Sequence, residues 1–356
     1  MIKYLGSKRT LLDTIEQVLS VIPNTRSVVD LFSGTSRVGH HLKGVGYQVF
    51  SNDLNTYAYA LATCYVQANR TPHTPEVVRL LKEMSSVEPR PGYFTKNFCE
   101  EARFFQPQNG AKVDGMRDWL EAQNLDWERK AILLVALMEA ADRVDSTCGI
   151  QMAYLKKWAS RSFNNLELRM PSLHDAAVSR SCKAYQGDAL INSAKISADV
   201  AYLDPPYNQH KYLGNYHIWE SLVKWDNPEV YGVARKRVDV RQRKSSFNRK
   251  REIHDAMRTI VSNLDVNHLV VSFSNEGYIE RDEMIEILET RGQVSVVEKD
   301  FKRYVGARIG IHSPKGEKVG EVSHVRNKEY LFVVSKDERV HKALNQNPLS
   351  DTGTQT

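Results

Sequence analysis

The sequence has little of what builds metal centres, disulfide frameworks or membrane spans. Its four cysteines are scattered, with no CxxC spacing and no clustered histidine partners. Neither a zinc site nor a disulfide framework is therefore expected. It has no run of about 18 apolar residues, and its polar N-terminal residues are unlike a secretory signal. We therefore expect a cytoplasmic, metal-free protein without a membrane span.

What the chain does contain is an alternation of strand-like and helix-like segments. Short apolar stretches ending in polar residues predict strands over residues 26–32, 47–53, 199–203, 268–274, 294–298 and 330–334. Helices are expected between them, at residues 38–42 and 216–224. The pattern favours an α/β fold that contains a nucleotide-binding βαβ unit, with ligands bound at the carboxyl ends of the strands.

The middle of the chain has a different pattern. Apolar residues recur at three- and four-residue spacing over residues 76–84, 113–122 and 127–142, which predicts helices. We expect a main domain formed by residues 1–64 and 183–342, a helical insertion at 65–182, and a disordered tail at 343–356.

Positive charge is concentrated in one segment of a chain whose net charge is only +6. Between residues 235 and 251 there are nine basic residues and one acid, Asp239. Such a density favours contact with a polyanion, since self-repulsion would otherwise keep the loop mobile; a solvated basic loop is the alternative. We predict that nucleic-acid phosphates are bound by Arg235, Lys236, Arg237, Arg241, Arg243, Lys244, Arg249, Lys250 and Arg251.

Asp204-Pro205-Pro206-Tyr207 is the most informative motif and follows the strand expected at residues 199–203. Each proline fixes its own backbone near φ −65°, lacks an N–H, and favours extended backbone in the residue before it. A carboxylate, a free carbonyl and an aromatic ring are thus held on a rigid turn. This combination is suited to gripping a planar amino group.

A second motif follows the first strand of the βαβ unit. Asp30 lies near the end of that strand, the small-residue turn Ser33-Gly34-Thr35-Ser36 follows it, and Asp53 ends the next strand. Asp53 is placed to accept hydrogen bonds from ribose hydroxyls. The turn lacks the G-x-G-x-x-G glycines that cradle phosphates, so a ligand without phosphate suits it better than a dinucleotide.

Together with Lys3-Tyr4-Leu5-Gly6-Ser7-Lys8 and Gly187-Asp188-Ala189, these motifs give the chain a family resemblance. Their order resembles that of Dam-like adenine-N6 DNA methyltransferases of the α type, and the downstream pattern resembles modification enzymes of type IIS restriction systems. The resemblance implies a Rossmann-like S-adenosylmethionine-dependent fold whose helical insertion recognises the target sequence. It implies cofactor binding by Tyr4, Lys8, Asp30, Phe32, Ser33, Gly34, Thr35, Asp53, Asp188 and Ala189, and catalysis by Asp204, Pro205, Pro206 and Tyr207.

The same resemblance implies methyl transfer to N6 of an adenine flipped out of double-stranded DNA, without a metal. A monomer is expected, with a cognate restriction endonuclease as a candidate partner. The open alternatives are RNA adenine-N6 methylation, DNA cytosine-N4 methylation and an inactive DNA-binding subunit. One position departs from the family, since Ser36 stands where a glycine is usual. Either Ser36 avoids the left-handed backbone region, or cofactor affinity is reduced.

Overall fold

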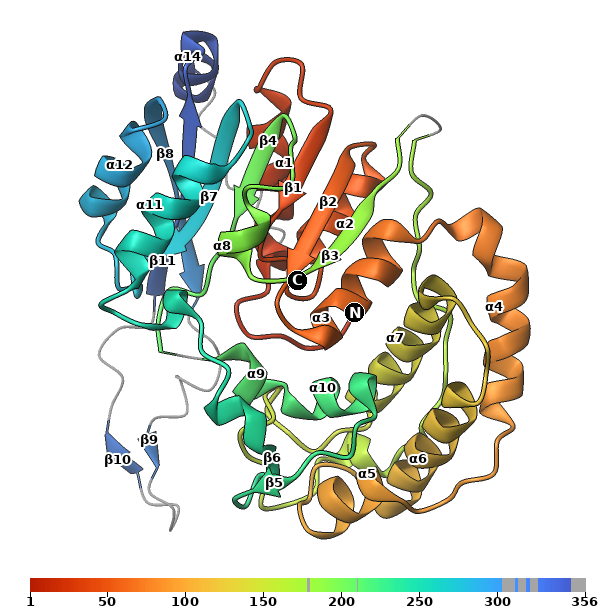
Figure 1. The fold of residues 1–356 in the computed structure, drawn as a ribbon. Coiled ribbons are helices and arrows are strands. Elements are labelled where there is room, and N and C mark those ends of the chain that lie inside the picture. The colour runs from red at the N-terminus through yellow and green to blue at the C-terminus, as the bar shows by residue number, and fades with distance from the viewer. Residues whose placement is uncertain (178–179, 210, 303–310, 313–317, 321–325, 347–356) are drawn as a thin grey trace. The chain divides into compact units, whose positions relative to one another are not determined.

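A computed structural model describes residues 1–177, 180–209, 211–302, 311–312, 318–320 and 326–346 (Figure 1). By backbone proximity the chain divides into two compact units. The first contains Met1–Arg9, Phe32–Asn192 and His210–Lys244, and the second contains Thr10–Leu31, Ser193–Gln209 and Ser245–Thr356. The predicted domain boundaries at residues 64/65 and 182/183 follow a different division and stay a prediction.

The main sheet has seven strands, and the predicted α/β class is confirmed. In the first unit the order is β3-β2, with β2 at Gln48–Asp53 and β3 at Lys183–Gln186. These two strands are parallel, and Asp53 pairs with Gln186 in register. Their carboxyl ends therefore meet, which brings residues 53–55 and 187–189 to the same edge.

Helices of the first unit surround this pair and form its large core. They are α2 (Arg37–Gly44), α3 (Thr56–Ala62), α4 (Arg70–Ser85), α5 (Tyr93–Thr95), α6 (Pro107–Glu121), α7 (Trp127–Arg143), α8 (Ala189–Asn192), α9 (Tyr212–Asn215) and α10 (His217–Lys224). The short helical turns are η2 (Thr63–Gln67), η3 (Lys96–Glu100), η4 (Ser160–Phe163) and η5 (Val238–Arg241). A two-stranded ribbon is formed by β5 (Val230–Tyr231) and β6 (Lys236–Arg237).

The three helices expected in the middle of the chain are confirmed as α4, α6 and α7, which pack on one another (Figure 1). Helix α7 begins at the N-cap Asp126, whose side chain accepts from the N–H of Arg129. Residues 131–138 of α7 are all fully buried. A helix that is apolar all round can be stable only inside a core, and α7 is the central helix of this one.

In the second unit the strand order is β1-β4-β7-β11-β8. The strands are β1 (Ser27–Asp30), β4 (Val200–Leu203), β7 (His268–Ser274), β8 (Gln293–Lys302) and β11 (Arg326–Ser335). β1, β4 and β7 are parallel, whereas β11 is antiparallel to both of its neighbours. Strand β4 is completely buried, as an inner parallel strand should be.

The helices of the second unit are α1 (Leu12–Ser20), α11 (Ile253–Asn263), α12 (Arg281–Glu289) and α14 (Glu338–Gln346), with the turn η6 (Ser246–Asn248); η1 (Lys8–Leu11) precedes α1. Helices α11 and α12 lie side by side (Figure 1). The short strands β9 (Ile311–His312) and β10 (Lys318–Gly320) pair with each other. Most of residues 303–325, which connect β8 to β11, lie outside the described residues.

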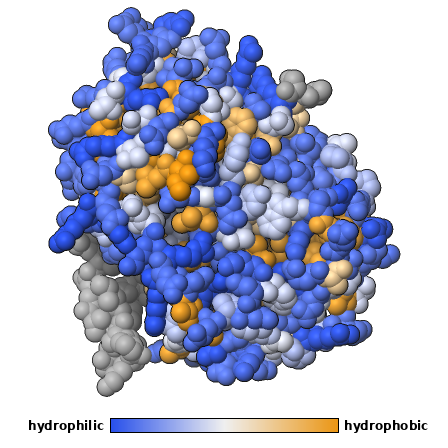
Figure 2. Space-filling model, viewed as in Figure 1, coloured by the Kyte–Doolittle hydropathy of each residue, from blue (hydrophilic) through white to orange (hydrophobic). Residues whose placement is uncertain are grey.

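The predicted disordered tail begins too early. Helix α14 continues to Gln346, and Leu344 in its last turn is buried, so residues 343–346 are helical. The rest of the expected tail, residues 347–356, lies outside the described residues. None of the helices in the described part of the chain is long and apolar enough to cross a membrane. The face of the molecule in Figure 2 is mostly hydrophilic, with hydrophobic residues in separate groups.

Candidate active site

The small-residue turn after residue 31 is held by the carboxylate that ends β2. The backbone N–H of Gly34 donates to Asp53 Oδ2 at 3.0 Å. Gly34 has φ +51°, and a Cβ at this position would lie 3.3 Å from Cε1 of Tyr4. Only glycine lets the backbone pass this close to the aromatic ring.

Ser36 adopts φ +58°, so it does occupy the left-handed region. The alternative in which this residue avoids that region is wrong. Ser36 is fully buried, and its N–H donates to the carbonyl oxygen of Ser33 at 2.6 Å. The turn therefore keeps a glycine-like backbone at a residue that pays a conformational penalty for it.

Asp53 is tied to the backbone on both sides. Besides Gly34, the N–H of Asn55 donates to its Oδ1 at 2.9 Å. Burial raises the pKa of Asp53 to about 6, although both backbone hydrogen bonds act to lower it. The carboxylate is still the main form at neutral pH, and an ionised carboxylate is a strong hydrogen-bond acceptor.

The predicted adenine-binding segment is joined to Asp53 through Gly187. The N–H of Gly187 donates to the carbonyl oxygen of Asp53 at 3.0 Å, and Asn52 Nδ2 donates to the carbonyl oxygen of Gly187 at 3.2 Å. Asp188 then turns the chain, since its Oδ1 accepts from the N–H of Leu190 at 2.9 Å. Asp188 and Ala189 therefore lie at the same strand edge as Asp53.

Aromatic rings from three parts of the sequence stack above the glycine turn. The ring of Tyr4 lies 4.4 Å from that of Tyr216 and 5.2 Å from that of Tyr212, with interplanar angles of 15° and 7°. The hydroxyls of Tyr4 and Tyr57 are 3.2 Å apart, and the hydroxyl of Tyr216 accepts from the N–H of Leu5 at 2.6 Å. Burial raises the pKa of Tyr4 well above its usual range, so this phenol stays neutral.

The structure thus brings Tyr4, Gly34 and Asp53 together within the first unit. The remaining predicted cofactor residues have these locations: Ser33 and Thr35 are buried in the turn, Phe32 is partly exposed, Lys8 is buried at the start of η1, and Asp30 is buried at the end of β1. The sequence did not indicate Glu220, which is fully buried and accepts from the N–H of Tyr57 at 3.0 Å. Its place on α10, four residues after Tyr216, is a signal that could have indicated it.

The Asp-Pro-Pro-Tyr turn belongs to the second unit. It follows β4 directly, and β4 is parallel to β1 with Asp30 opposite Tyr202. The N–H of Leu31 donates to the carbonyl oxygen of Tyr202 at 3.3 Å. The carboxyl ends of β1 and β4 therefore meet, and Asp30 lies at the edge where the Asp204 turn begins.

The four residues of this turn form no helix or strand, as two successive prolines require. Pro205 is buried, whereas Asp204, Pro206 and Tyr207 are partly exposed. The Tyr207 ring meets Phe273 of β7 edge to face at 5.7 Å, and its carbonyl oxygen accepts from the N–H of Tyr278 at 2.8 Å. The end of β7 thus fixes the backbone and ring of Tyr207.

Comparison with known proteins shows to which family these motifs belong. The family model of D12 class N6 adenine-specific DNA methyltransferases matches residues 4–287, a span that includes the glycine turn and the Asp-Pro-Pro-Tyr turn. The chain belongs to this family. The resemblance predicted from the motifs, and with it the Rossmann-like fold, is confirmed.

Several curated proteins are similar to this chain over most of its length. The type II methyltransferase M.FokI of Planomicrobium okeanokoites is 29% identical over 99% of this chain and 55% of its own length. The modification methylase StsI of Streptococcus sanguinis is 29% identical over 98% of this chain and 55% of its own. The type II methyltransferase M.NlaIII of Neisseria lactamica is 28% identical over 92% of this chain and 99% of its own. The chain thus spans about half the length of the first two.

The basic segment of this D12-class chain is not a uniformly solvated loop. Arg237 is buried, with its guanidinium bonded to both oxygens of Asp226 and to both oxygens of Asp239. These partners keep the pKa of Arg237 above its usual range despite burial. Arg237 therefore already has anionic partners within the protein, and its predicted contact with a phosphate stays a prediction.

Other members of the segment also have partners within their own unit. Arg243 donates to buried Glu220 at 2.8 Å and to the carbonyl oxygen of Leu54 at 3.2 Å. Arg235 donates to Asn97, and Arg249 forms an ion pair with Glu252. The exposed members are Arg241, Lys244, Lys250 and Arg251, of which Arg241 stacks on the ring of Tyr231 at 3.8 Å.

His217 is the first residue of α10. It is fully buried, with its Nε2 3.0 Å from the carbonyl oxygen of Gln151. Burial lowers the pKa of His217 to about 3, so it is neutral at physiological pH.

Proposed function

We propose that this chain is a sequence-specific DNA methyltransferase that transfers a methyl group from S-adenosylmethionine to N6 of a flipped-out adenine. The observation that carries the proposal is the Asp-Pro-Pro-Tyr turn at the carboxyl end of β4, beside Asp30 at the end of β1, in a D12-class chain. In open α/β sheets, ligands bind at such strand ends.

The residues present fit the cofactor that the family implies. Asp53 offers a carboxylate at the end of β2, where ribose hydroxyls can donate to it. The glycine turn forms a cradle that a Cβ at Gly34 would fill, and Tyr4 covers it. We assign cofactor holding to these residues, with Asp188 and Ala189 on the adenine side and Lys8, Asp30, Phe32, Ser33 and Thr35 at the methionine end. When bound, S-adenosylmethionine supplies an electrophilic methyl group on a sulfonium.

The chemistry of the target explains the need for the Asp204 turn. The lone pair of adenine N6 is delocalised into the ring, which makes it a poor nucleophile. If the Asp204 carboxylate and the Pro205 carbonyl oxygen both accept its hydrogens, the nitrogen becomes more tetrahedral and the lone pair localises. Orientation by this rigid turn supplies much of the remaining rate enhancement. The N6–C bond would form as the S–C bond to the methyl group breaks, and the proton that N6 then loses would pass to the Asp204 carboxylate or to water, so no base has to remove it before the attack.

The remaining roles concern the DNA. A base inside a duplex cannot reach such a turn, so the adenine must be flipped out. We assign stacking on the flipped ring to Tyr207, whose own ring is supported by Phe273. The exposed basic residues of the 235–251 segment are proposed to contact phosphates. Within the same proposal the enzyme is a cytoplasmic monomer, with a restriction endonuclease of the same specificity as a candidate partner.

The deciding experiment is transfer of a tritiated methyl group to double-stranded DNA and, in a parallel reaction, to RNA, both in the presence of EDTA and followed by digestion to nucleosides. We expect N6-methyldeoxyadenosine as the product. Methylated deoxycytidine would indicate the N4-cytosine alternative, and label incorporated only into RNA would indicate an RNA methyltransferase. No transfer to any nucleic acid, combined with normal DNA binding, would indicate an inactive binding subunit.

A matched pair of variants assigns the activity to the turn. Asp204→Asn should eliminate transfer, because an amide has lost one acceptor and the negative charge. Asp255→Asn makes the same change on α11, where the side chain is 86% exposed, and should leave transfer unchanged. Equal activity of both variants would refute the role of Asp204.

A further inference from the structure

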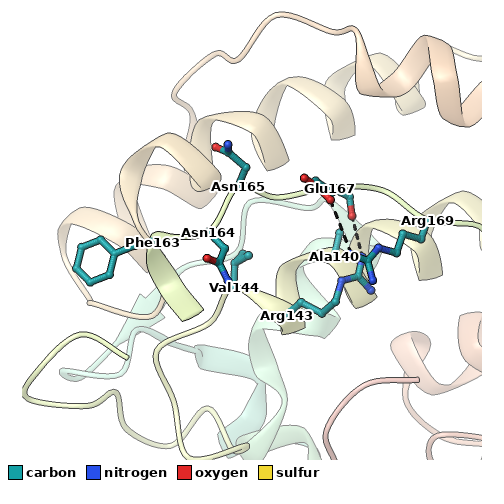
Figure 3. Close-up of a pocket in the computed structure, with 8 residues that line it drawn as sticks. All are labelled: Ala140, Arg143, Val144, Phe163, Asn164, Asn165, Glu167 and Arg169. Atoms are coloured by element: carbon teal, nitrogen blue, oxygen red, sulfur yellow. Dashed lines mark hydrogen bonds and ion pairs between the residues drawn. The ribbon is translucent and has the colours of Figure 1, made fainter. Parts of the chain in front are cut away.

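The helical part of the first unit contains a pocket that the proposed chemistry does not use. It has a volume of about 430 Å³ and lies between the end of α7 and the segment that follows η4 (Figure 3). Its lining is mainly polar, with amides, guanidiniums and a carboxylate among the residues: Ala140, Arg143, Val144, Phe163, Asn164, Asn165, Glu167 and Arg169.

The backbone of this segment is fixed from two helices. Asn109 of α6 is buried (1% exposed), and its Nδ2 donates to the carbonyl oxygens of Asn164 at 2.9 Å and of Ser162 at 3.4 Å. Its Oδ1 accepts from the N–H of Leu166 at 3.0 Å. From α7, Arg143 donates to the carbonyl oxygen of Glu167 at 2.7 Å (Figure 3). The segment is therefore rigid although it has no regular secondary structure.

This rigid backbone presents side chains that the fold does not need. Phe163 is 63% exposed, and it is the only large aromatic side chain classed as exposed in the part of the chain that the structure describes. Asn164, Asn165 and Arg169 are exposed as well. A solvated phenylalanine held in one place is unfavourable for the free protein, and in DNA-binding proteins such apolar groups contact bases or enter base steps.

The charges favour base edges over phosphates. Arg143 is already engaged with the backbone, and Glu167 lies 3.8 Å from Arg169 in an exposed pair. A carboxylate would repel a phosphate, but it can accept from the amino group of cytosine. Carboxamides pair with adenine and guanidiniums with guanine in the major groove. The pocket thus combines several groups that read base edges.

We propose that Phe163, Asn164, Asn165 and Arg169 contact bases of the recognition sequence other than the methylated adenine, and so determine specificity. The amides and the guanidinium form hydrogen bonds with base edges, and Phe163 packs against a base. This inference rests on the proposed function, since it needs DNA to be the substrate. Asn109 is a positioning residue that acts only through the backbone it holds.

The test determines which sites the enzyme methylates. Plasmid DNA is treated with the wild-type protein, with Asn164→Ala/Asn165→Ala and with Phe163→Ala, and the N6-methyladenine positions are mapped by sequencing. We expect the double variant to accept other bases at one or two positions of the motif, with discrimination there reduced roughly tenfold or more. Asn263→Ala, an exposed amide on α11, is the control and should keep the wild-type motif.

Two further measurements separate the outcomes. Cofactor affinity and Tm should be unchanged in the variants, because the replaced side chains, those of Phe163, Asn164 and Asn165, are exposed. The salt dependence of DNA binding should also keep its slope, since base contacts release no counterions. An unchanged motif in both pocket variants would overturn the inference, as would equal losses on all sequences with a flatter salt slope, which would indicate phosphate contacts. Failure of the wild-type protein to methylate DNA would instead refute the proposed function.

Discussion

Asp53 and Asp204 follow parallel strands in the two units, and they are embedded in very different ways. Asp53 accepts hydrogen bonds from the backbone at Gly34 and Asn55 and is part of the turn it supports. Asp204 is partly exposed and begins a turn whose backbone is restricted by two successive prolines. The comparison teaches that the Asp53 carboxylate holds the backbone of its own site, whereas the turn at Asp204 is restricted by proline chemistry.

The largest effect is expected from a substitution of Asp204. Asp204→Ala should reduce methyl transfer by about three orders of magnitude or more, within the range that positioning contributes to catalysis. S-Adenosylmethionine should bind as tightly as before, and Tm should hardly change. Single-turnover kinetics and calorimetric titration measure these quantities. Complete loss of cofactor binding in this variant would contradict the separation of roles.

On the Asp53 side we expect loss of affinity and stability together. Asp53→Ala should weaken cofactor binding by about 1–3 kcal/mol and also lower the free energy of unfolding, because buried N–H groups lose their acceptor. Calorimetric titration and urea unfolding test both. Asp53→Asn is the matched variant, since its one remaining oxygen can satisfy one of the two N–H groups. Normal stability with lost affinity would mean that Gly34 and Asn55 find other acceptors.

The basic segment also contains both paired and exposed side chains. Arg237 and Arg243 form hydrogen bonds with carboxylates of the protein. Lys244, Lys250 and Arg251 are exposed. Replacing the three exposed residues by Ala should flatten the slope of log K against log salt by about two to three units. Affinity should fall similarly on cognate and random duplexes, since phosphates carry no sequence information.

A control for this salt titration replaces three exposed cations elsewhere, Arg258, Lys336 and Lys342, which should leave the slope unchanged. By contrast, Arg237→Ala should mainly destabilise the fold, because Asp226 and Asp239 lose their shared partner. An unchanged slope in the first triple variant would mean that the exposed cations are only solvated.

Burial raises the pKa of Asp53 to about 6, so cofactor affinity and stability should both depend on pH. Cofactor affinity should decline about tenfold per pH unit below 6, because a protonated carboxyl is a weaker acceptor for ribose hydroxyls. The free energy of unfolding changes in the opposite direction. The stabilisation from proton binding by Asp53 is fully present below its pKa in the unfolded chain, about 4, and is lost as pH rises through 6. Cofactor titrations and denaturant unfolding between pH 5 and 8 should show both trends, and Asp53→Asn should abolish them. A flat affinity profile in the wild type would contradict the ribose assignment.

The smallest effect concerns Ser36. Its left-handed backbone costs about 1–2 kcal/mol, a cost that glycine would avoid. Glycine would in turn make folding less favourable by about 0.5–1 kcal/mol, because it loses more conformational freedom on folding. Ser36→Gly should therefore stabilise the fold by up to about 1 kcal/mol. Ser36→Ala keeps the unfavourable φ and is the control. Chemical denaturation decides, and a destabilised glycine variant would show that the buried hydroxyl contributes more than the backbone costs.

Local sequence determined much of this protein. The strands around residues 27–30, 48–53 and 200–203, the turn at Gly34 and the extended segment at Pro205 and Pro206 follow from apolar patterning and from the fixed backbone preferences of glycine and proline. The helices of the insertion follow from their periodicity. These features depend on neighbours within a few residues, so the sequence alone could indicate them.

Only the tertiary structure decided how the cations, the aromatic rings and the surface pocket are arranged. Tyr4 meets Tyr216 across more than two hundred residues, Arg243 is paired with buried Glu220, and Asn109 fixes a segment about fifty residues away. Such pairings form where distant segments pack together, and side chains equal in charge and local context then become either buried partners or exposed ligands. A charge run in sequence cannot reveal which of its members are already paired, because that depends on the desolvation and geometry of the folded chain.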